Sequence, residues 1–361
     1  MSEVRKYTYA PETVTPPGET LEEVLVERGM TQAELAIRTG RPTKTINEIV
    51  KGKAAITPET ALQFELVLGI PSSFWSAREQ LYREALARAR EKKSHEKQID
   101  WLKQIPYREM VKLGWLEDRK GSGEKVEELL RYFGVASAAS WDDLWGQTQV
   151  SFRRSPSFKG EPGSVAAWLR KGRIESFHLK TSNFSANAFR DALFEIRALT
   201  GSLPDDFASI VVEKLSKVGV KLVFVPELPK TCAWGAARWL SQTTPLIQLS
   251  LRYKTDDHLW FTLFHEAAHI LFHGKRTVFV DTDELADAEE EREANAFARD
   301  FLVPPADYEK FLRRRSVSCV EIERFALALG IAPGIVVGRL QHDGKLRRDS
   351  CNDLKIPVGW L

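Results

Sequence analysis

The sequence predicts an α+β protein that is mostly helical, with an all-α N-terminal domain and a C-terminal domain that combines helices with a small β-sheet. Two short helical segments flank a glycine turn within the first 53 residues, and further helical patterns follow. Three strand-forming runs then lead into a long apolar segment, residues 256–273, which contains no glycine or proline. These observations indicate two or three domains in a chain of 361 residues.

Composition limits the classes of function. The formal net charge is only +2, so any binding of nucleic acid must come from a local basic patch. No apolar run reaches the length of a membrane span and no N-terminal signal segment is evident, so we expect a cytoplasmic protein. The three cysteines, Cys232, Cys319 and Cys351, lack metal-ligand spacing, and we expect free thiols in a reducing compartment.

The N-terminal helical pair begins with a capping box, Thr31 to Glu34. A short helix through Leu35 is followed by a turn at Gly40 and a second helix over Thr43–Val50, with Ile46 among its core residues. We expect the second helix to read base edges and neighbouring cations to contact phosphates. The expected DNA contacts are Gln32, Arg41, Thr43, Lys44, Thr45, Asn47, Lys51 and Lys53. The alternative is a generic helical bundle with solvated lysines.

The segment from "GETLEEVL" through "MTQAELAIRTGRPTKTINEIVKGK" to "LGIPSSFW" resembles the XRE-type helix-turn-helix of HigA-like antitoxins, across residues 15–86. The resemblance implies a domain that binds double-stranded operator DNA. Pro42 stands where family members often have serine, and proline is compatible with a helix start.

A chemical motif lies in the apolar helix expected over residues 256–273. His265, Glu266 and His269 form HExxH, and on a helix the two histidines share one face because they are four residues apart. Two imidazoles suit Zn²⁺, and Glu266 can take a proton from a metal-bound water. A catalytic zinc site usually needs a third protein ligand.

The third ligand is expected on a second helix, which begins in the acidic run from Glu289 and is stopped by Pro304. Glu291 is preferred because Asn295, four residues on, shares its face and can orient a ligating histidine from the second shell. Glu293 is the reserve candidate and Glu290 the third. The alternative is that these glutamates only favour the helix dipole.

The segments "TDDHLWFTLFHEAAHILFH" and "EREANAFARDFLVP" resemble the ImmA/IrrE family of metallopeptidases, across residues 175–345. The resemblance implies a zincin-like, zinc-dependent peptidase core. It also implies His265, His269 and Glu291 as metal ligands and Glu266 as the general base. The residues that end the second helix are Leu302-Val303-Pro304 rather than the Leu-Met-Pro that is commoner in the family.

Further candidates for substrate contact are Tyr253, His258 and His273. His258 lies about 10 Å along the helix from His265 and is too far away to share its metal. The strand candidates are Lys221–Val225, Trp234–Leu240 and Leu246–Leu251. We expect the last of these, or its neighbour, to form a sheet edge that holds an extended peptide.

The expected division is 1–76, the helix-turn-helix domain; 77–105, a charged helical connector; 106–175, a helical middle region of unknown role; 176–345, the peptidase domain; and 346–361, a tail. Trp141, Trp145 and Trp168 are interpreted as core residues. The tail of the peptidase domain is expected to contain two short helices around Gly330 and Pro333.

The expected function is a DNA-binding transcriptional regulator fused to a zinc-dependent endopeptidase. Its candidate substrates are a repressor, an antitoxin or the chain itself. The alternative is a non-proteolytic HigA-like repressor or antitoxin whose peptidase-like domain only binds or senses. Expected partners are operator DNA, a protein substrate or a partner repressor or toxin, and a second copy of the chain, since helix-turn-helix proteins commonly bind paired half-sites. No membrane partner is expected.

Overall fold

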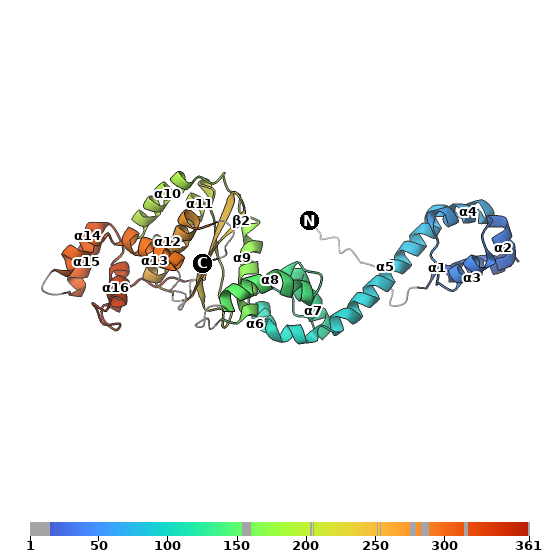
Figure 1. The fold of residues 1–361 in the computed structure, drawn as a ribbon, viewed down its shortest axis with the longest axis horizontal. Coiled ribbons are helices and arrows are strands. Elements are labelled where there is room, and N and C mark those ends of the chain that lie inside the picture. Colours follow the sequence, from blue (N-terminus) through green and yellow to red (C-terminus); the bar gives the residue numbers. More distant parts are fainter. Residues whose placement is uncertain are drawn as a thin grey trace, which may run out of the picture. The chain divides into compact units, whose positions relative to one another are not determined.

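The computed structural model describes residues 15–153, 160–202, 204, 206–250, 252, 254–274, 279–282, 289–313 and 317–359. The described part is mostly helical and contains a four-stranded sheet, which confirms the expected fold class (Figure 1). The chain separates into two compact units, residues 1–97 and 98–361. Among the described residues, no helix is both long enough and apolar enough to cross a membrane.

The first unit is an all-helical bundle. Its helices are α1 (Pro17–Glu27), α2 (Gln32–Thr39), α3 (Thr43–Val50), α4 (Pro58–Leu68) and α5 (Ser72–Glu96). The Thr31 hydroxyl accepts a hydrogen bond from the Glu34 amide at 3.1 Å and starts α2. Gly40, with φ 68°, ends α2 in the left-handed conformation that a tight interhelical turn requires. As expected, Leu35, Ile46 and Ile49 are buried.

Helix α5 packs against the bundle through its N-terminal part. Trp75 is fully buried against the core of the bundle, and the Glu79 carboxylate accepts a hydrogen bond from the Ile56 amide at 3.1 Å. The remainder of α5 exposes its charged side chains, which include the Arg88–Glu84 pair one turn apart. The charged segment expected as a connector therefore begins as a continuation of this long helix.

The second unit contains the remaining elements. They are η1 (Ile99–Gln104), α6 (Tyr107–Lys112), α7 (Ser122–Phe133), α8 (Ala138–Arg153), α9 (Pro162–Ser176), α10 (Ala186–Leu199), α11 (Phe207–Lys217), β1 (Lys221–Phe224), β2 (Ala233–Ser241), β3 (Thr244–Leu249), α12 (Asp256–Phe272), β4 (Phe279–Thr282), α13 (Glu289–Leu302), α14 (Pro305–Leu312), α15 (Cys319–Leu329), α16 (Pro333–His342) and η2 (Asn352–Leu354). The two short helices expected around Gly330 and Pro333 are α15 and α16.

A helix of the expected middle region, α9, covers one face of the sheet. Trp141 and Trp168 are fully buried and Trp145 is half-buried, so the core interpretation of these tryptophans is confirmed. The Trp168 indole donates to the Val225 carbonyl at 3.0 Å, and the Gln248 amide donates to the Trp168 carbonyl at 2.8 Å. These bonds fasten α9 to the strands. The boundary expected at residue 176 therefore lies inside one compact unit and stays a prediction.

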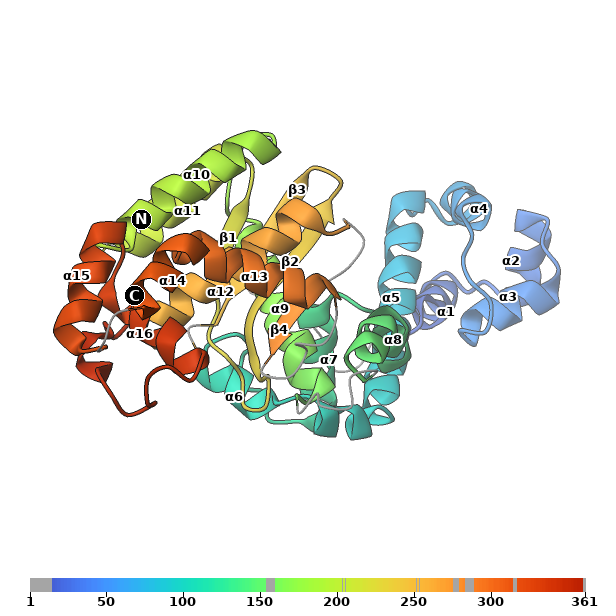
Figure 2. The ribbon, with the colours of Figure 1, turned by 60° about the vertical axis from the view of Figure 1, so that its left-hand side comes forward.

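The sheet has the strand order β1-β3-β2-β4, with β1 parallel to β3 and the other neighbours antiparallel. Its side chains alternate between two buried faces. Leu222, Ala237 and Ile247 join the core around α12, whereas Val223 and Leu246 join the core around α9. The sheet therefore lies between α9 and α12 (Figure 1, Figure 2).

The expectation for the substrate-holding edge was wrong for the last predicted strand. Strand β3, which covers most of the last predicted strand, lies between β1 and β2. Its neighbour β2 is covered by β4, a four-residue strand that the sequence analysis did not detect. In the described sheet the edges are β1 and β4. The error arose because strand order depends on crossover connections, which the pattern within each strand does not contain.

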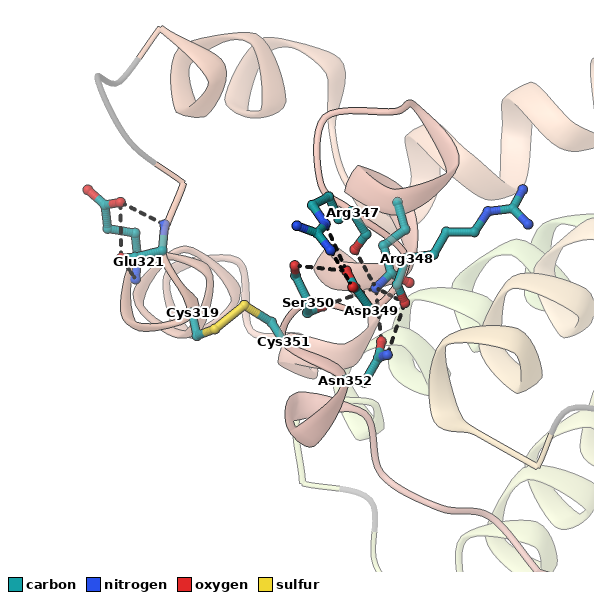
Figure 3. Close-up of a disulfide and its surroundings, with 10 residues drawn as sticks. Cys319, Glu321, Arg347, Arg348, Asp349, Ser350, Cys351 and Asn352 are labelled. Atoms are coloured by element: carbon teal, nitrogen blue, oxygen red, sulfur yellow. Dashed lines mark hydrogen bonds and ion pairs between the residues drawn. A yellow bond between two sulfur atoms is a disulfide. The ribbon is translucent and has the colours of Figure 1, made fainter.

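The expectation of free cysteines was also wrong for two of the three. Cys319 at the start of α15 and Cys351 before η2 form a disulfide across 32 residues, whereas Cys232 is free (Figure 3). The chain folds back after α16, which brings the two cysteines together, and their spacing in the sequence does not reveal this. Beyond the disulfide, the Ile356 carbonyl accepts a hydrogen bond from the Asp256 amide at 2.9 Å, so the C-terminal segment contacts the start of α12.

Candidate metal centre and nucleic-acid interface

Helix α12 carries the HExxH motif in a buried position. The side chains of His265, Glu266 and His269 are all buried, between the sheet and α13. One helical turn separates the histidines, and it brings their Nε2 atoms to within 3.0 Å of each other.

Helix α13 brings Glu291 to the same place. Glu291, Ala294, Ala298 and Leu302 are buried at three- and four-residue spacing, which is the face that a helix presents to a neighbour. The Glu291 carboxylate lies 3.1 Å from His265 Nε2 and 3.5 Å from His269 Nε2. The other two candidates, Glu290 and Glu293, are exposed. Glu291 is thus the glutamate that the structure groups with the histidine pair.

The cluster of His265, His269 and Glu291 matches the donor set of a tetrahedral zinc site. The three ligand atoms all lie within 4.8 Å of one another. Bonds of about 2.0–2.1 Å at tetrahedral angles separate neighbouring ligand atoms by about 3.3 Å. The observed separations of 3.0, 3.1 and 3.5 Å surround that value. Two nitrogens, one carboxylate and full burial therefore fit a single zinc ion.

Electrostatics favours the protonation states that a metal needs. Burial alone would raise the pKa of the Glu291 carboxyl, but the close contacts with the His265 and His269 rings outweigh it and lower that pKa to about 2. Burial lowers the pKa of His269. The carboxylate is therefore ionised and burial favours the neutral form of the His269 ring near neutral pH, which are the forms that bind zinc.

Glu266 lies against the backbone of β2. A Cβ atom at Gly235 would stand 2.5 Å from Glu266 Oε1 and 2.7 Å from the Thr262 side chain. Only glycine therefore lets the strand approach the general-base candidate this closely. Gly235 was not among the residues expected at the site. An isolated glycine in the strand pattern "AWGAARW" is the signal that could have found it.

The other residues expected near the site have separate surroundings. Asn295 Oδ1 lies 3.1 Å from His265 Nδ1, on the ring edge opposite the ligand cluster. His273 contacts His269 at Nδ1, whereas His269 faces the other two cluster residues with Nε2. His258, beside the Trp234 ring, lines a small pocket with Arg252 and Lys254. Tyr253 lies outside the described residues.

In the first unit, the residues expected to contact DNA lie on and beside α3. Thr43, Lys44, Lys51 and Lys53 are exposed, whereas Arg41, Thr45, Asn47 and Gln32 are half-buried. Asn47 donates to the Gln32 side chain at 3.2 Å, and Arg41 donates to Gln63 at 2.7 Å. The N-terminal half of α3 therefore presents short polar side chains and a lysine next to flanking cations.

Two family descriptions match separate parts of the chain. Residues 21–75 match the helix-turn-helix family, and residues 224–338 match the IrrE N-terminal-like domain, a peptidase family. A solved structure of an addiction module antidote protein of a HigA family from Coxiella burnetii is 30% identical. The alignment covers 23% of this chain and 92% of that chain, with a TM-score of 0.22. A comparison with curated proteins finds no match. The first unit therefore contains an XRE-type helix-turn-helix domain, and the second contains a domain that matches the IrrE-like peptidases.

Proposed function

We propose that this protein is a DNA-binding transcriptional regulator whose second unit is a zinc-dependent endopeptidase that cleaves a protein substrate. The observation that carries the proposal is the buried cluster of His265, His269 and Glu291 with Glu266 beside it. Such a cluster is the His₂Glu donor set of a catalytic zinc site, and it lies in the part of the chain that matches a peptidase family.

The residues of the chain have distinct roles in this reaction. A zinc ion bound by the three ligands would polarise the peptide carbonyl and make water more acidic. Glu266 takes the proton from the attacking water and later delivers it to the nitrogen of the leaving amine. Gly235 leaves room for the Glu266 carboxylate against β2. An extended substrate is held by addition to the edge strand β4, which is paired with β2 on its other side.

The test is replacement of Glu266 with Gln, which keeps the shape of the side chain and removes the base. We expect cleavage to fall by roughly 10²–10⁴-fold, the range for loss of a general base, while bound zinc is retained. The readout is mass spectrometry of the zinc-loaded chain, incubated alone for self-cleavage and with an unstructured peptide mixture. Glu290→Gln, an exposed neighbour of the cluster, is the matched control. Cleavage by the Glu266→Gln variant at the wild-type rate would overturn the assignment.

The first unit is proposed to bind a double-stranded operator as a homodimer, with α3 in the major groove. The sequence-specific part of the binding is assigned to Thr43, Lys44, Thr45 and Asn47, and the phosphate contacts to the flanking cations. Selection from random duplex DNA, followed by footprinting, tests the assignment. Two protected half-sites about one helical turn apart support the dimer, and a single half-site bound by a monomer contradicts it.

A second function is favoured by the separation of the chain into two compact units. The protein would be a HigA-like repressor or antitoxin whose peptidase-like unit binds or senses a partner without cutting it. The Glu266→Gln variant discriminates the two. Repression that responds normally to the partner in this variant supports the non-proteolytic function, and loss of the response supports proteolysis. A cytoplasmic location remains part of both proposals.

A further inference from the structure

His273 and Glu293 form a chain of contacts behind one of the candidate metal ligands. His273 is the first residue after α12, where the backbone leaves the helical path, and its side chain is only 4% exposed. Its Nδ1 atom lies 2.8 Å from His269 Nδ1, and its Nε2 atom lies 3.1 Å from the Glu293 carboxylate. Glu293 belongs to α13, two residues beyond Glu291, and its side chain is 56% exposed.

The order of these contacts determines where the protons lie. A carboxylate only accepts hydrogen bonds, so the His273 Nε2 atom carries a proton and donates a hydrogen bond to Glu293. In a neutral imidazole the other nitrogen is then an acceptor, so His273 Nδ1 accepts from His269 Nδ1. The remaining nitrogen of His269, Nε2, is left with its lone pair. This atom is the one that faces His265 and Glu291.

The other histidine of the motif, His265, is oriented by a single contact with the same polarity. The Asn295 carbonyl oxygen lies 3.1 Å from His265 Nδ1, so it accepts a hydrogen bond from that atom and leaves the Nε2 lone pair toward the cluster. Both histidines therefore present the nitrogen that a metal requires. Their supports differ, because Asn295 contacts its histidine directly and Glu293 acts through His273.

We propose that His273 and Glu293 are positioning residues, which fix the tautomer and ring orientation of His269 and thereby increase the zinc affinity of the cluster. The inference rests on the proposed metal site. It gives Glu293 a role as an outer partner rather than a ligand, because its carboxylate contacts His273, whereas Glu291 contacts both candidate ligands. It also places His273 behind a ligand rather than against a substrate. Helix α13 thereby contacts the three histidines through Glu291, Glu293 and Asn295.

The test measures zinc affinity of the full chain by competition with a chromophoric chelator. Loss of an outer-shell partner typically weakens metal binding by about 10–100-fold, and we expect that range for Glu293→Gln and for His273→Ala. The double variant should be no weaker than His273→Ala, because Glu293 acts through His273. Glu290→Gln is the matched control and should bind zinc as the wild type does. The visible spectrum of the Co²⁺-loaded protein gives a second readout, which should change in both single variants.

Each outcome bears on the proposal. Wild-type affinity and an unchanged cobalt spectrum in both single variants would overturn it and leave the metal site intact. Weak binding in Glu293→Gln with normal binding in His273→Ala would also overturn it, because Glu293 would then act directly. A folded wild-type chain that binds no zinc would overturn this inference and the proposed metal site together. Since Glu293 is exposed, its variant is expected to fold, and circular dichroism checks this.

Discussion

The two units place their functional candidates in opposite surroundings. On α3, the Lys44 side chain is 85% exposed and its nearest acidic neighbour, Glu48, is 3.9 Å away. On α12 and α13, the side chains of His265 and Glu291 are 0% and 8% exposed and lie 3.1 Å apart. An exposed charge stays solvated, so each contact that it forms contributes little by itself. A buried charge is stable only with partners, so changes in the second unit should affect neighbouring groups as well.

The largest effect is expected from removing the buried Glu291 carboxylate of the second unit. Glu291→Ala removes the proposed third ligand and also the carboxylate that faces both histidines. We expect zinc affinity to fall by more than the roughly 10–100-fold of an outer-shell change. Competition with a chromophoric chelator measures the loss, and Glu289→Ala, an exposed residue of the same helix, serves as the control. An affinity loss of less than tenfold would show that Glu291 is not a ligand.

The disulfide offers a way to unfold one unit and leave the other unchanged. Cys319→Ser opens a loop of 32 residues, and the chain-entropy relation then gives a loss of about 4 kcal/mol as an upper value. We expect the transition of the second unit to move to lower temperature in calorimetry, while that of the first unit stays in place. Cys232→Ser should have a much smaller effect. A shift of both transitions would break the comparison, because the units would then not unfold separately.

The start of α12 should make the second unit sensitive to pH. Burial, with the Asp257 carboxylate nearby, raises the pKa of Asp256 to about 6. The folded-state pKa of Asp256 is above its unfolded value near 4. The free energy of unfolding is therefore highest below pH 4, and it decreases as the pH rises through 6. The loss is about 2–3 kcal/mol at pH 7.5. Asp256→Asn keeps an oxygen for the Ile356 amide and should raise the melting temperature at pH 7.5 but not at pH 4. A lower melting temperature at pH 7.5 would contradict this.

Gly235 tests whether close packing positions the general-base candidate. Gly235→Ala would place a methyl group 2.5 Å from Glu266 Oε1, so the carboxylate must move. A displacement of about 1 Å can reduce a rate by about a hundredfold, and we expect a loss of ten- to a hundredfold in kcat with zinc retained. Gly274→Ala, where a Cβ would meet nothing within 4 Å, is the control. An unchanged kcat would mean that the carboxylate position does not matter.

The smallest effect is expected on the exposed surface of the first unit. Lys53→Ala should weaken DNA binding only a few-fold and reduce the slope of log affinity against log salt by about 0.9, because one phosphate contact is lost. Fluorescence anisotropy across a range of salt concentrations measures both. Lys92→Ala, an exposed lysine of α5, is the control. Abolished binding in Lys53→Ala would contradict the expectation that each exposed cation contributes little to DNA binding.

The sequence was sufficient where structure depends on neighbouring residues. The span expected for the second helix of the helix-turn-helix is that of α3, and the apolar segment from residue 256 became α12. His265, His269 and Glu291 form one cluster, because each lies on the helical face that packs against the other helix. Features that join distant segments were missed, namely strand β4, the sheet edge, the Cys319–Cys351 disulfide and the proximity of Gly235 to Glu266. Periodicity specifies which face of an element is buried, but it does not specify the partner that covers that face.

The most direct test of the account is the zinc content per chain of the wild type and of His269→Ala, measured by elemental analysis after dialysis. The account predicts close to one zinc per wild-type chain and almost none in the variant, with DNA binding equal in both. A folded wild-type chain that binds DNA but holds no zinc, even after reconstitution with Zn²⁺ and other divalent metals, would contradict it.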